Sequence, residues 1–339
     1  MEIEIIKNKN KSMIKENPNK EIILEKEIFY ISFIDNNTKI VVGMQNDIIE
    51  IYDSDLEQKL ITINNQPSSY FTELSDKVIE KNIKRIKLLC CSYNYILKIF
   101  EIIIIDDNKV GFNLLHSFHP KESRNEINKA IELKNENKNI VSIDENNIII
   151  YEYLDDENYF EIKKIQVEGA NNIININEKL FCVSLNNKGI IQFYDSNNFE
   201  LIKEIKNIEA FGCNDYLCKL NPKYLLVGGF DYLSILDINC MQLNTKIQLM
   251  KYKERITCTC SIMDKNILIV GTKYKNKNDE FMYDIVLYKL DDNNCLSEIK
   301  RYSNAHDKII NAIIYYSGKI ISCSEDKKIK IWNFINNEI

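Results

Sequence analysis

A short β-type segment recurs seven times along this chain of 339 residues, and the repeat limits the possible folds more than any other feature. The segment has an apolar residue, any residue, a second apolar residue, a bulky residue and then, in most copies, a polar one. Its bulky position falls at Tyr52, Phe100, Tyr151, Tyr194, Leu236, Tyr288 and Trp332, with separations of 42 to 52 residues. A regular period of this length indicates repeated supersecondary units.

Each repeat contains more than this one strand. A second apolar run precedes the segment, and in most repeats a short turn rich in Asn, Asp, Gly or Lys separates the two. Two such runs joined by a tight polar turn are typical of a β-hairpin. A further apolar run comes before the hairpin, for example at 28–34 and 310–316, and a more polar alternating run follows most hairpins. Each unit therefore has about four strands, and the most polar one suits an outer edge.

Four-stranded units of this size are typical of propeller blades, because one such sheet cannot bury both of its faces alone. We predict an all-β fold, a seven-bladed β-propeller of four-stranded antiparallel blades, as a single domain over residues 19–339. The last repeat stops without a fourth strand, whereas residues 20–27 form an unpaired one. This N-terminal strand is predicted to close the ring within the last blade. Residues 1–18 are predicted to form a tail or an extra strand.

Residues 304–334, NAHDKIINAIIYYSGKIISCSEDKKIKIWNF, resemble one repeat of the WD-repeat β-propeller family. An Ala-His pair ending at His306 stands where the family usually has Gly-His. Asp326 lies in the turn, and Trp332 matches the family's Trp, although Asn333 replaces the usual Asp. The other repeats match the family weakly.

The resemblance implies a hydrogen-bonded network within the last blade, formed by His306, Asp326, Trp332 and either Ser322 or Ser324. The residues themselves support this arrangement, because a buried indole N–H needs an acceptor and a neighbouring hydroxyl can supply one. Trp332 is therefore predicted to be structural and not a ligand platform.

Composition excludes several classes of function. The net charge is -6 and acidic and basic residues are interspersed, so no nucleic acid partner is expected. The longest aliphatic run, 102–105, is too short for membrane insertion, and no signal-peptide pattern opens the chain. Several of the ten cysteines lie in apolar runs and none forms a CxxC pair, which indicates a reducing, cytoplasmic location.

No motif for catalysis or cofactor binding stands out. The chain has only nine glycines and lacks phosphate-binding and nucleophile-elbow patterns. His116 and His119 are three residues apart, which places them on opposite sides of a strand, so a solvated loop is preferred over a metal pair. We expect no cofactor, no metal site and no enzymatic activity.

The WD-repeat resemblance implies a rigid platform for proteins or peptides. The predicted function is a non-catalytic interaction scaffold, a subunit of a larger assembly and a monomer within that hetero-complex. The alternative is a substrate-recognition adaptor for an enzyme complex such as a ubiquitin ligase. Exposed aromatic and Arg residues often anchor interfaces, although packing within a blade is an equal alternative for each. The candidate partner-binding residues are Tyr93, Tyr95, Phe211, Phe230, Tyr232 and Arg255.

Overall fold

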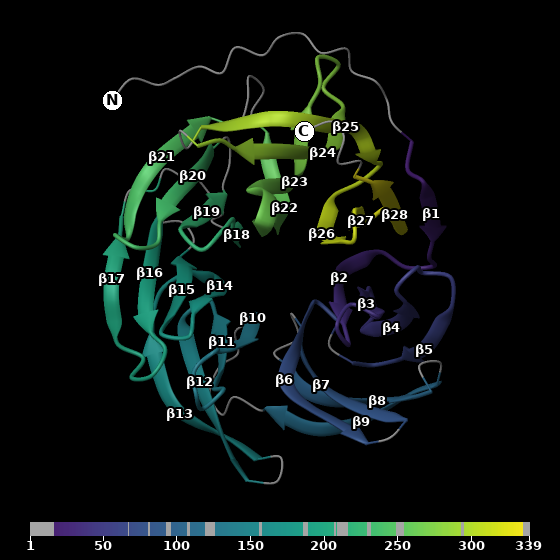
Figure 1. The fold of residues 1–339 in the computed structure, drawn as a ribbon, viewed down its shortest axis with the longest axis vertical. Helices are drawn as coiled ribbons and strands as arrows, with labels where there is room; N and C mark the ends of the chain where they lie inside the picture. Colours follow the sequence, from purple (N-terminus) through teal and green to yellow (C-terminus); the bar gives the residue numbers. More distant parts are fainter. Residues whose placement is uncertain are drawn as a thin grey trace. The chain divides into compact units, whose positions relative to one another are not determined.

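The computed structural model describes residues 17–66, 68–80, 82–92, 96–106, 109–118, 126–155, 158–185, 189–206, 208, 216–228, 232–248, 254–292 and 295–334. In this part of the chain every regular element is a β-strand except the 3-10 turn η1 (Met263–Lys265). The strands form seven four-stranded antiparallel sheets, the blades of a β-propeller (Figure 1). The predicted fold class is confirmed.

The chain divides into two compact units. One joins Met1–Glu25 to Ile208–Ile339, and the other is the continuous segment Lys26–Asn207. The single domain expected over residues 19–339 stays a prediction. Residues 1–16 of the expected tail or extra strand lie outside the described residues.

The continuous unit contains four blades, each with its strands paired in chain order. Blade 1 consists of β2 (Ile28–Ile34), β3 (Lys39–Met44), β4 (Ile48–Asp53) and β5 (Lys59–Ile63). Blade 2 consists of β6 (Tyr70–Glu80), β7 (Ile83–Ser92), β8 (Ile96–Ile105) and β9 (Lys109–Phe118). Blade 3 consists of β10 (Ile127–Glu132), β11 (Ile140–Asp144), β12 (Asn147–Asp155) and β13 (Asn158–Gln166). Blade 4 consists of β14 (Ala170–Asn177), β15 (Leu180–Leu185), β16 (Ile190–Asp195) and β17 (Leu201–Ile205).

The other unit contains three blades. Blade 5 consists of β18 (Tyr216–Lys219), β19 (Tyr224–Gly228), β20 (Tyr232–Asp237) and β21 (Gln242–Gln248). Blade 6 consists of β22 (Arg255–Ile262), β23 (Ile267–Lys275), β24 (Phe281–Leu290) and β25 (Leu296–His306). Blade 7 consists of β26 (Ile310–Tyr316), β27 (Lys319–Ser324), β28 (Lys328–Asn333) and β1 (Lys20–Ile23).

The bulky position of each repeat is a core position on the third strand of its blade. Its Cα partner on the second strand is apolar in every blade; Trp332, for example, pairs with Ile320. The seven side chains are at most 6% exposed, and they are Tyr52, Phe100, Tyr151, Tyr194, Leu236, Tyr288 and Trp332. The repeat therefore follows the core of the blades.

First strands are buried with a period of three residues in the two clearest cases, β2 and β14. In β2 the buried residues are Ile28, Ile31 and Ile34, with half-buried side chains between them. A bulge between Ile28 and Tyr30 shifts the register with β3, and a bulge increases the local twist of a strand. The half-buried positions of first strands include side chains that reach the neighbouring blade.

The N-terminal strand β1 completes blade 7, as the sequence predicts. It pairs antiparallel with β28, with Lys20 opposite Ile331. Within this ladder the carboxylate of Glu21 lies 3.4 Å from the ammonium of Lys330, and just beyond it the backbone N–H of Leu24 donates to the carbonyl of Lys327 at 2.8 Å.

A chain that begins at Lys26 should be less stable, because β28 then presents unpaired N–H and C=O groups along its edge. We expect the thermal unfolding midpoint, followed by the fluorescence of the single tryptophan, Trp332, to fall by at least about 5 °C. A chain that begins at Asn17 keeps β1 and serves as the matched control. Equal midpoints for the two chains would show that β1 does not stabilise blade 7.

Candidate functional site

Blade 7 contains a chain of hydrogen bonds between four side chains. The indole Nε1 of Trp332 donates to the hydroxyl oxygen of Ser322 (3.0 Å), and this hydroxyl lies 2.8 Å from Nε2 of His306. The other ring nitrogen, Nδ1, lies 2.9 Å from the carboxylate of Asp326. These residues come from β28, β27, the end of β25 and the turn between β27 and β28.

Burial determines the protonation of this network. His306 is 2% exposed, and burial lowers its pKa although Asp326 acts in the opposite direction. A neutral imidazole that donates from Nδ1 to Asp326 can accept the Ser322 proton at Nε2, so every member has a partner. Burial would raise the pKa of Asp326, but hydrogen bonds from His306 and from the backbone N–H groups of Asp307 and Lys328 lower it to about 2. The hydrogen-bonding groups of the network have partners within it, so we interpret the network as structural.

Ser324, the other serine that the resemblance offered, has a different role. Its hydroxyl donates to the carbonyl of Lys308 (3.2 Å) and accepts the backbone N–H of Asp326 (3.1 Å). It orders the turn, and Ser322 is the serine that Trp332 contacts.

In two other blades the tyrosine at the bulky position forms a hydrogen bond to a residue of its own strand. The hydroxyl of Tyr52 donates to Glu50 (2.5 Å) in blade 1, and that of Tyr194 donates to Gln192 (2.6 Å) in blade 4. In both blades the position of the network serine is a valine, namely Val42 and Val183. Because valine cannot accept, the phenol bonds to a residue of its own strand.

Blade 6 contains a second buried polar cluster, which the repeat pattern does not predict. The guanidinium of Arg301 donates through Nη1 to Glu254 (3.0 Å) and Asp284 (2.9 Å), and through Nη2 to Glu298 (2.9 Å). The side chains of Glu254 and Asp284 are 1% and 0% exposed. Asp284 also accepts from a tyrosine hydroxyl and a backbone N–H. Three carboxylates share one guanidinium, so the cluster is negatively charged when all are ionised.

Glu254 is the least satisfied carboxylate of this cluster. Within the described residues nothing donates to its Oε2, and the buried hydroxyls of Thr272 and Tyr288 also have no hydrogen-bond partner there. Burial raises the pKa of Glu254 to about 7, although Arg301 opposes the shift. The charges of Asp284 and Glu298 act in the same direction as burial. A proton on Glu254 reduces the excess of negative charge.

This pKa makes stability depend on pH. Between about 4.5 and about 7 the folded chain holds a proton on Glu254 that the unfolded chain releases, so the free energy of unfolding should fall as pH rises through this interval. We expect Glu254→Gln to remove that slope, seen as a pH-dependent difference between the two chains in urea denaturation. Glu101→Gln, in a partly exposed ion pair of blade 2, is the control and should keep the slope. Parallel curves for wild type and Glu254→Gln would contradict the assignment.

Side chains of first strands join neighbouring blades within each unit. Glu73 of β6 accepts the backbone N–H of Asp35 in blade 1 (2.8 Å), and Glu132 of β10 accepts that of Ser75 in blade 2 (2.7 Å). In the other unit, Ser261 of β22 donates to a β18 carbonyl (2.8 Å). These bonds connect one blade to the next.

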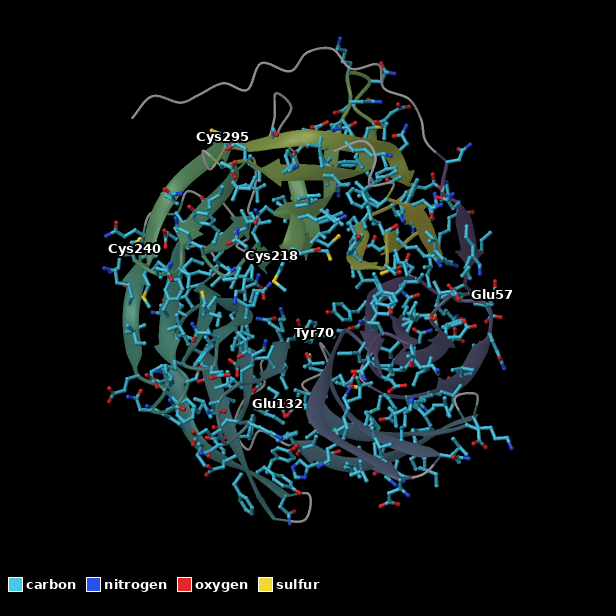
Figure 2. All side chains as sticks on the ribbon, viewed as in Figure 1. Glu57, Tyr70, Glu132, Cys218, Cys240 and Cys295 are labelled. Carbon is cyan, nitrogen blue, oxygen red and sulfur yellow. The ribbon has the colours of Figure 1, made fainter. Side chains whose placement is uncertain are left out.

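A cavity of about 460 Å³ lies at one of these junctions and is lined by Glu132, which Figure 2 labels. Burial raises the pKa of Glu132, while the backbone N–H of Ser75 lowers it. Asn175 of β14 donates to the Glu132 carbonyl (2.7 Å). The polar groups here connect blades 2, 3 and 4, and we interpret the cavity as a seam between blades.

Blade 2 is longer than its neighbour blade 1. Its strands contain 11, 10, 10 and 10 residues, against 7, 6, 6 and 5 in blade 1. The added length exposes aliphatic side chains near the β6–β7 and β8–β9 turns: Val78 is 49% exposed, Ile79 68% and Ile105 37%. This end of the blade therefore exposes apolar side chains to solvent.

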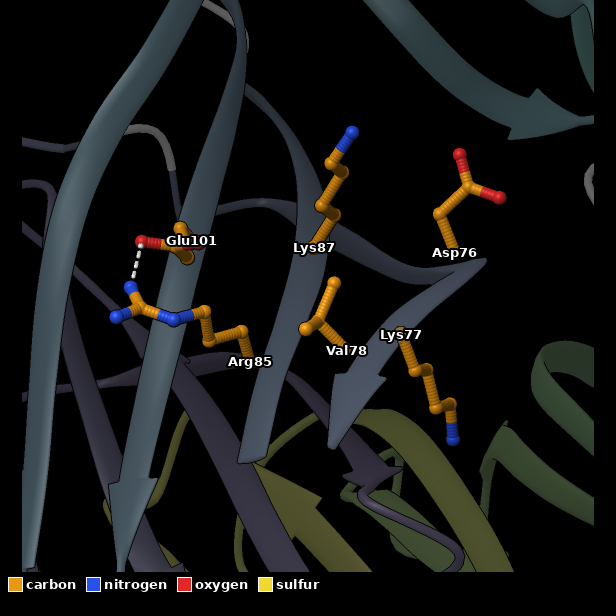
Figure 3. A pocket seen from close by; sticks show the side chains of 6 residues that line it. All are labelled: Asp76, Lys77, Val78, Arg85, Lys87 and Glu101. Carbon is orange, nitrogen blue, oxygen red and sulfur yellow. Dashed lines mark hydrogen bonds and ion pairs between the residues drawn. The ribbon is translucent and has the colours of Figure 1, made fainter. Parts of the chain in front are cut away.

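One face of this end, which we call the blade 2 shelf, consists of two cross-strand rows. They are the row Val78, Arg85, Ile103 and Gly111 and the row Lys87, Glu101 and Asn113. A cavity of about 320 Å³ opens beside it. Figure 3 shows the guanidinium of Arg85 turned toward Glu101, while Lys87 extends away from both.

The predicted partner-binding residues are not among those that define the shelf. Tyr93, Tyr95, Phe211 and Phe230 fall outside the described residues. Tyr232 begins β20, and Arg255 begins β22 and is half-buried. A role of these six residues in partner binding stays a prediction, and none of them belongs to the blade 2 shelf.

The expected loop around the first two histidines is wrong for His116. This residue lies in β9, where its ring packs 4.5 Å from Phe118 and 5.6 Å from Tyr159. His119 lies outside the described residues.

Among the described residues no group of three or more His, Cys, Asp or Glu side chains is arranged to hold a metal ion. The described residues contain no helix long and apolar enough to cross a membrane. The cysteines described there are free thiols, of which Cys240 and Cys295 are exposed and Cys218 is buried (Figure 2).

Comparison with known proteins shows the fold. No family model and no curated protein matches the sequence. Among solved structures, a chain of "Crystal Structure of Mitotic Checkpoint Complex" matches with a TM-score of 0.66 and 10% sequence identity, over 98% of this chain and 100% of that chain. In all, 1141 solved chains match, so the fold is common and does not identify a function. The class defined here is the seven-bladed β-propeller.

Proposed function

We propose that this chain is a non-catalytic, WD-repeat-like platform that binds other proteins as a subunit of a larger assembly. The observation that carries this proposal is exposed apolar surface that the fold does not require. Eight of the fifteen exposed large apolar side chains among the described residues lie in blades 2 and 3: Val78, Ile79, Ile105, Phe112, Leu114, Tyr153, Phe160 and Ile162. Such concentrations commonly mark protein interfaces.

Further observations support the proposal. The polar clusters of blades 6 and 7 are used within the blades, and the structurally similar chain comes from the crystal structure of a protein complex. Buried free thiols such as Cys90, Cys182 and Cys323, whose pKa values burial raises, suit a reducing cytoplasmic location. The net charge of -6 favours protein over nucleic acid partners. We propose a monomer within a hetero-complex, without a cofactor.

The second candidate function is an adaptor that presents substrates to an enzyme such as a ubiquitin ligase. Affinity purification at native expression level with quantitative mass spectrometry separates the two. Recovery of one assembly at equal stoichiometry supports the scaffold. Many substoichiometric proteins together with a ligase support the adaptor. If the affinity purification recovers no other protein, both candidate functions are wrong.

A further inference from the structure

We propose that the blade 2 shelf binds an extended segment of a partner protein that carries an aliphatic side chain and, two residues further on, an acidic one. This inference rests on the proposed function and specifies the surface and the chemistry of the partner. The shelf lies near the β6–β7 and β8–β9 turns, at the opposite end of the blade from the β7–β8 connection.

The first row of the shelf carries an aliphatic side chain on each side of Arg85. Val78 on β6 is 49% exposed, Ile103 on β8 is half-buried, and Ile105, two residues further along β8, is 37% exposed. Solvent-exposed faces of antiparallel sheets usually carry polar side chains. An aliphatic side chain laid on this row would remove apolar surface of both molecules from water.

Gly111 leaves space on the same row. It lies inside β9, and a Cβ added to it would meet no heavy atom within 4 Å. Its backbone is not in the left-handed region, so the strand geometry does not require glycine here. Glycine weakens a strand interior and often marks the close approach of another backbone. The chain has only nine glycines, so one at this position is informative.

Charge determines the second feature of the partner. Glu101 already accepts from Arg85 (3.1 Å) and Asn113 (3.2 Å), and Asp76 at the edge of the cavity pairs with Lys138 (2.6 Å). The ammonium of Lys87 lies 5.0 Å from the centre of the Tyr153 ring, and no carboxylate within the described residues pairs with it. Lys87 is therefore the cation of the shelf that is available to a ligand, and its ammonium favours a carboxylate.

The two rows also determine how far apart the aliphatic and the acidic residue of the ligand must be. Lys87 lies two residues from Arg85 along β7, which corresponds to about 7 Å in a strand. In an extended ligand, residues i and i+2 face the same side at about the same distance. An aliphatic residue on the first row thus places an acidic residue at i+2 beside Lys87.

Fluorescence anisotropy with defined peptides tests the proposal. The probe is a fluorescein-labelled Ser-Ile-Ser-Glu-Ser-Ile-Ser-Glu, and its matched peptides carry Lys for Glu or Ser for Ile. We expect the folded full chain to bind the probe at least about tenfold more tightly than either matched peptide. Binding to the Lys peptide with equal affinity, or no saturable binding of the probe, would overturn the proposal.

Three variants locate the site. Val78→Asp and Gly111→Val should weaken probe binding by at least about tenfold, and Lys87→Gln should weaken it and reduce its salt dependence. Gly111→Val should do so while the unfolding midpoint stays unchanged or rises, which a purely structural role would not produce. Leu201→Asp is matched to Val78→Asp, because Leu201 is also 49% exposed, and Lys203→Gln is matched to Lys87→Gln.

The controls separate the shelf from the proposed function. If Leu201→Asp weakens probe binding as much as Val78→Asp does, the probe does not bind at the shelf. If Val78→Asp and Gly111→Val recover the same assembly as wild type in affinity purification, the shelf proposal fails and the scaffold function stands. If wild type recovers no assembly but binds the probe specifically, the scaffold function fails instead.

Discussion

Arg301→Met should be among the most destabilising substitutions in the chain. It leaves Glu254, Asp284 and Glu298 close together without their shared cation, and two of these carboxylates are fully buried. Removing one partner of a buried ion pair typically costs about 3–5 kcal/mol. We expect a loss of this size at pH 8 in urea denaturation followed by the fluorescence of Trp332.

Two comparisons make this expectation specific. Arg85→Met breaks an ion pair with Glu101 in which the arginine side chain is 37% exposed, and it should cost about 1 kcal/mol or less. Because Glu254 takes up a proton near pH 7, the loss caused by Arg301→Met should be smaller at pH 5 than at pH 8. Similar losses for the two arginine variants would show that the blade 6 cluster is not critical.

Trp332→Ala is the second substitution for which we expect a large effect. The indole is 2% exposed, its ring lies 5.0 Å from that of Tyr302, and its N–H donates to Ser322. Truncation of a buried aromatic residue to alanine typically costs about 3–5 kcal/mol. Circular dichroism during urea denaturation measures the loss, since the variant has no tryptophan.

Trp332→Phe separates packing from hydrogen bonding. It keeps most of the apolar volume but removes the donor to Ser322, so it should cost about 1–3 kcal/mol. Ile23→Ala, in the same blade at a position that is 70% exposed, should have little effect. A cost for Trp332→Ala no greater than that for Ile23→Ala would mean that blade 7 does not depend on its tryptophan.

The repeat predicted the core because a blade buries the same positions each time. Trp332 and Leu236 share a position although their chemistry differs, and both are buried. The closing strand, predicted over 20–27 and observed over Lys20–Ile23, was predictable for a related reason, since the last repeat lacked a fourth strand. Period-three burial in β2 was not predictable, because it depends on a bulge and on the neighbouring blades.

The polar sites were less predictable. The contacts of His306, Ser322 and Asp326 follow a motif that the last repeat retains, but the contacts of Arg301 arise from residues on different strands with no repeated spacing. The shelf left one weak signal, the aliphatic run 102–105, which does not by itself indicate an exposed face. The exposure of Val78 depends on where neighbouring strands end, which the sequence of one blade does not contain.

The pairing of β1 with β28 also affects how the chain folds during synthesis. Lys20 is translated before all the other strands described here, yet its partner Ile331 is translated after nearly all of them. The continuous unit Lys26–Asn207 has all its strands as soon as it is translated, whereas the other unit is incomplete until β28 has been made. Bringing the two ends together requires a long closure, which slows folding. Incomplete chains that lack β28 therefore leave β1 unpaired and are the species in which we expect aggregation and chaperone binding.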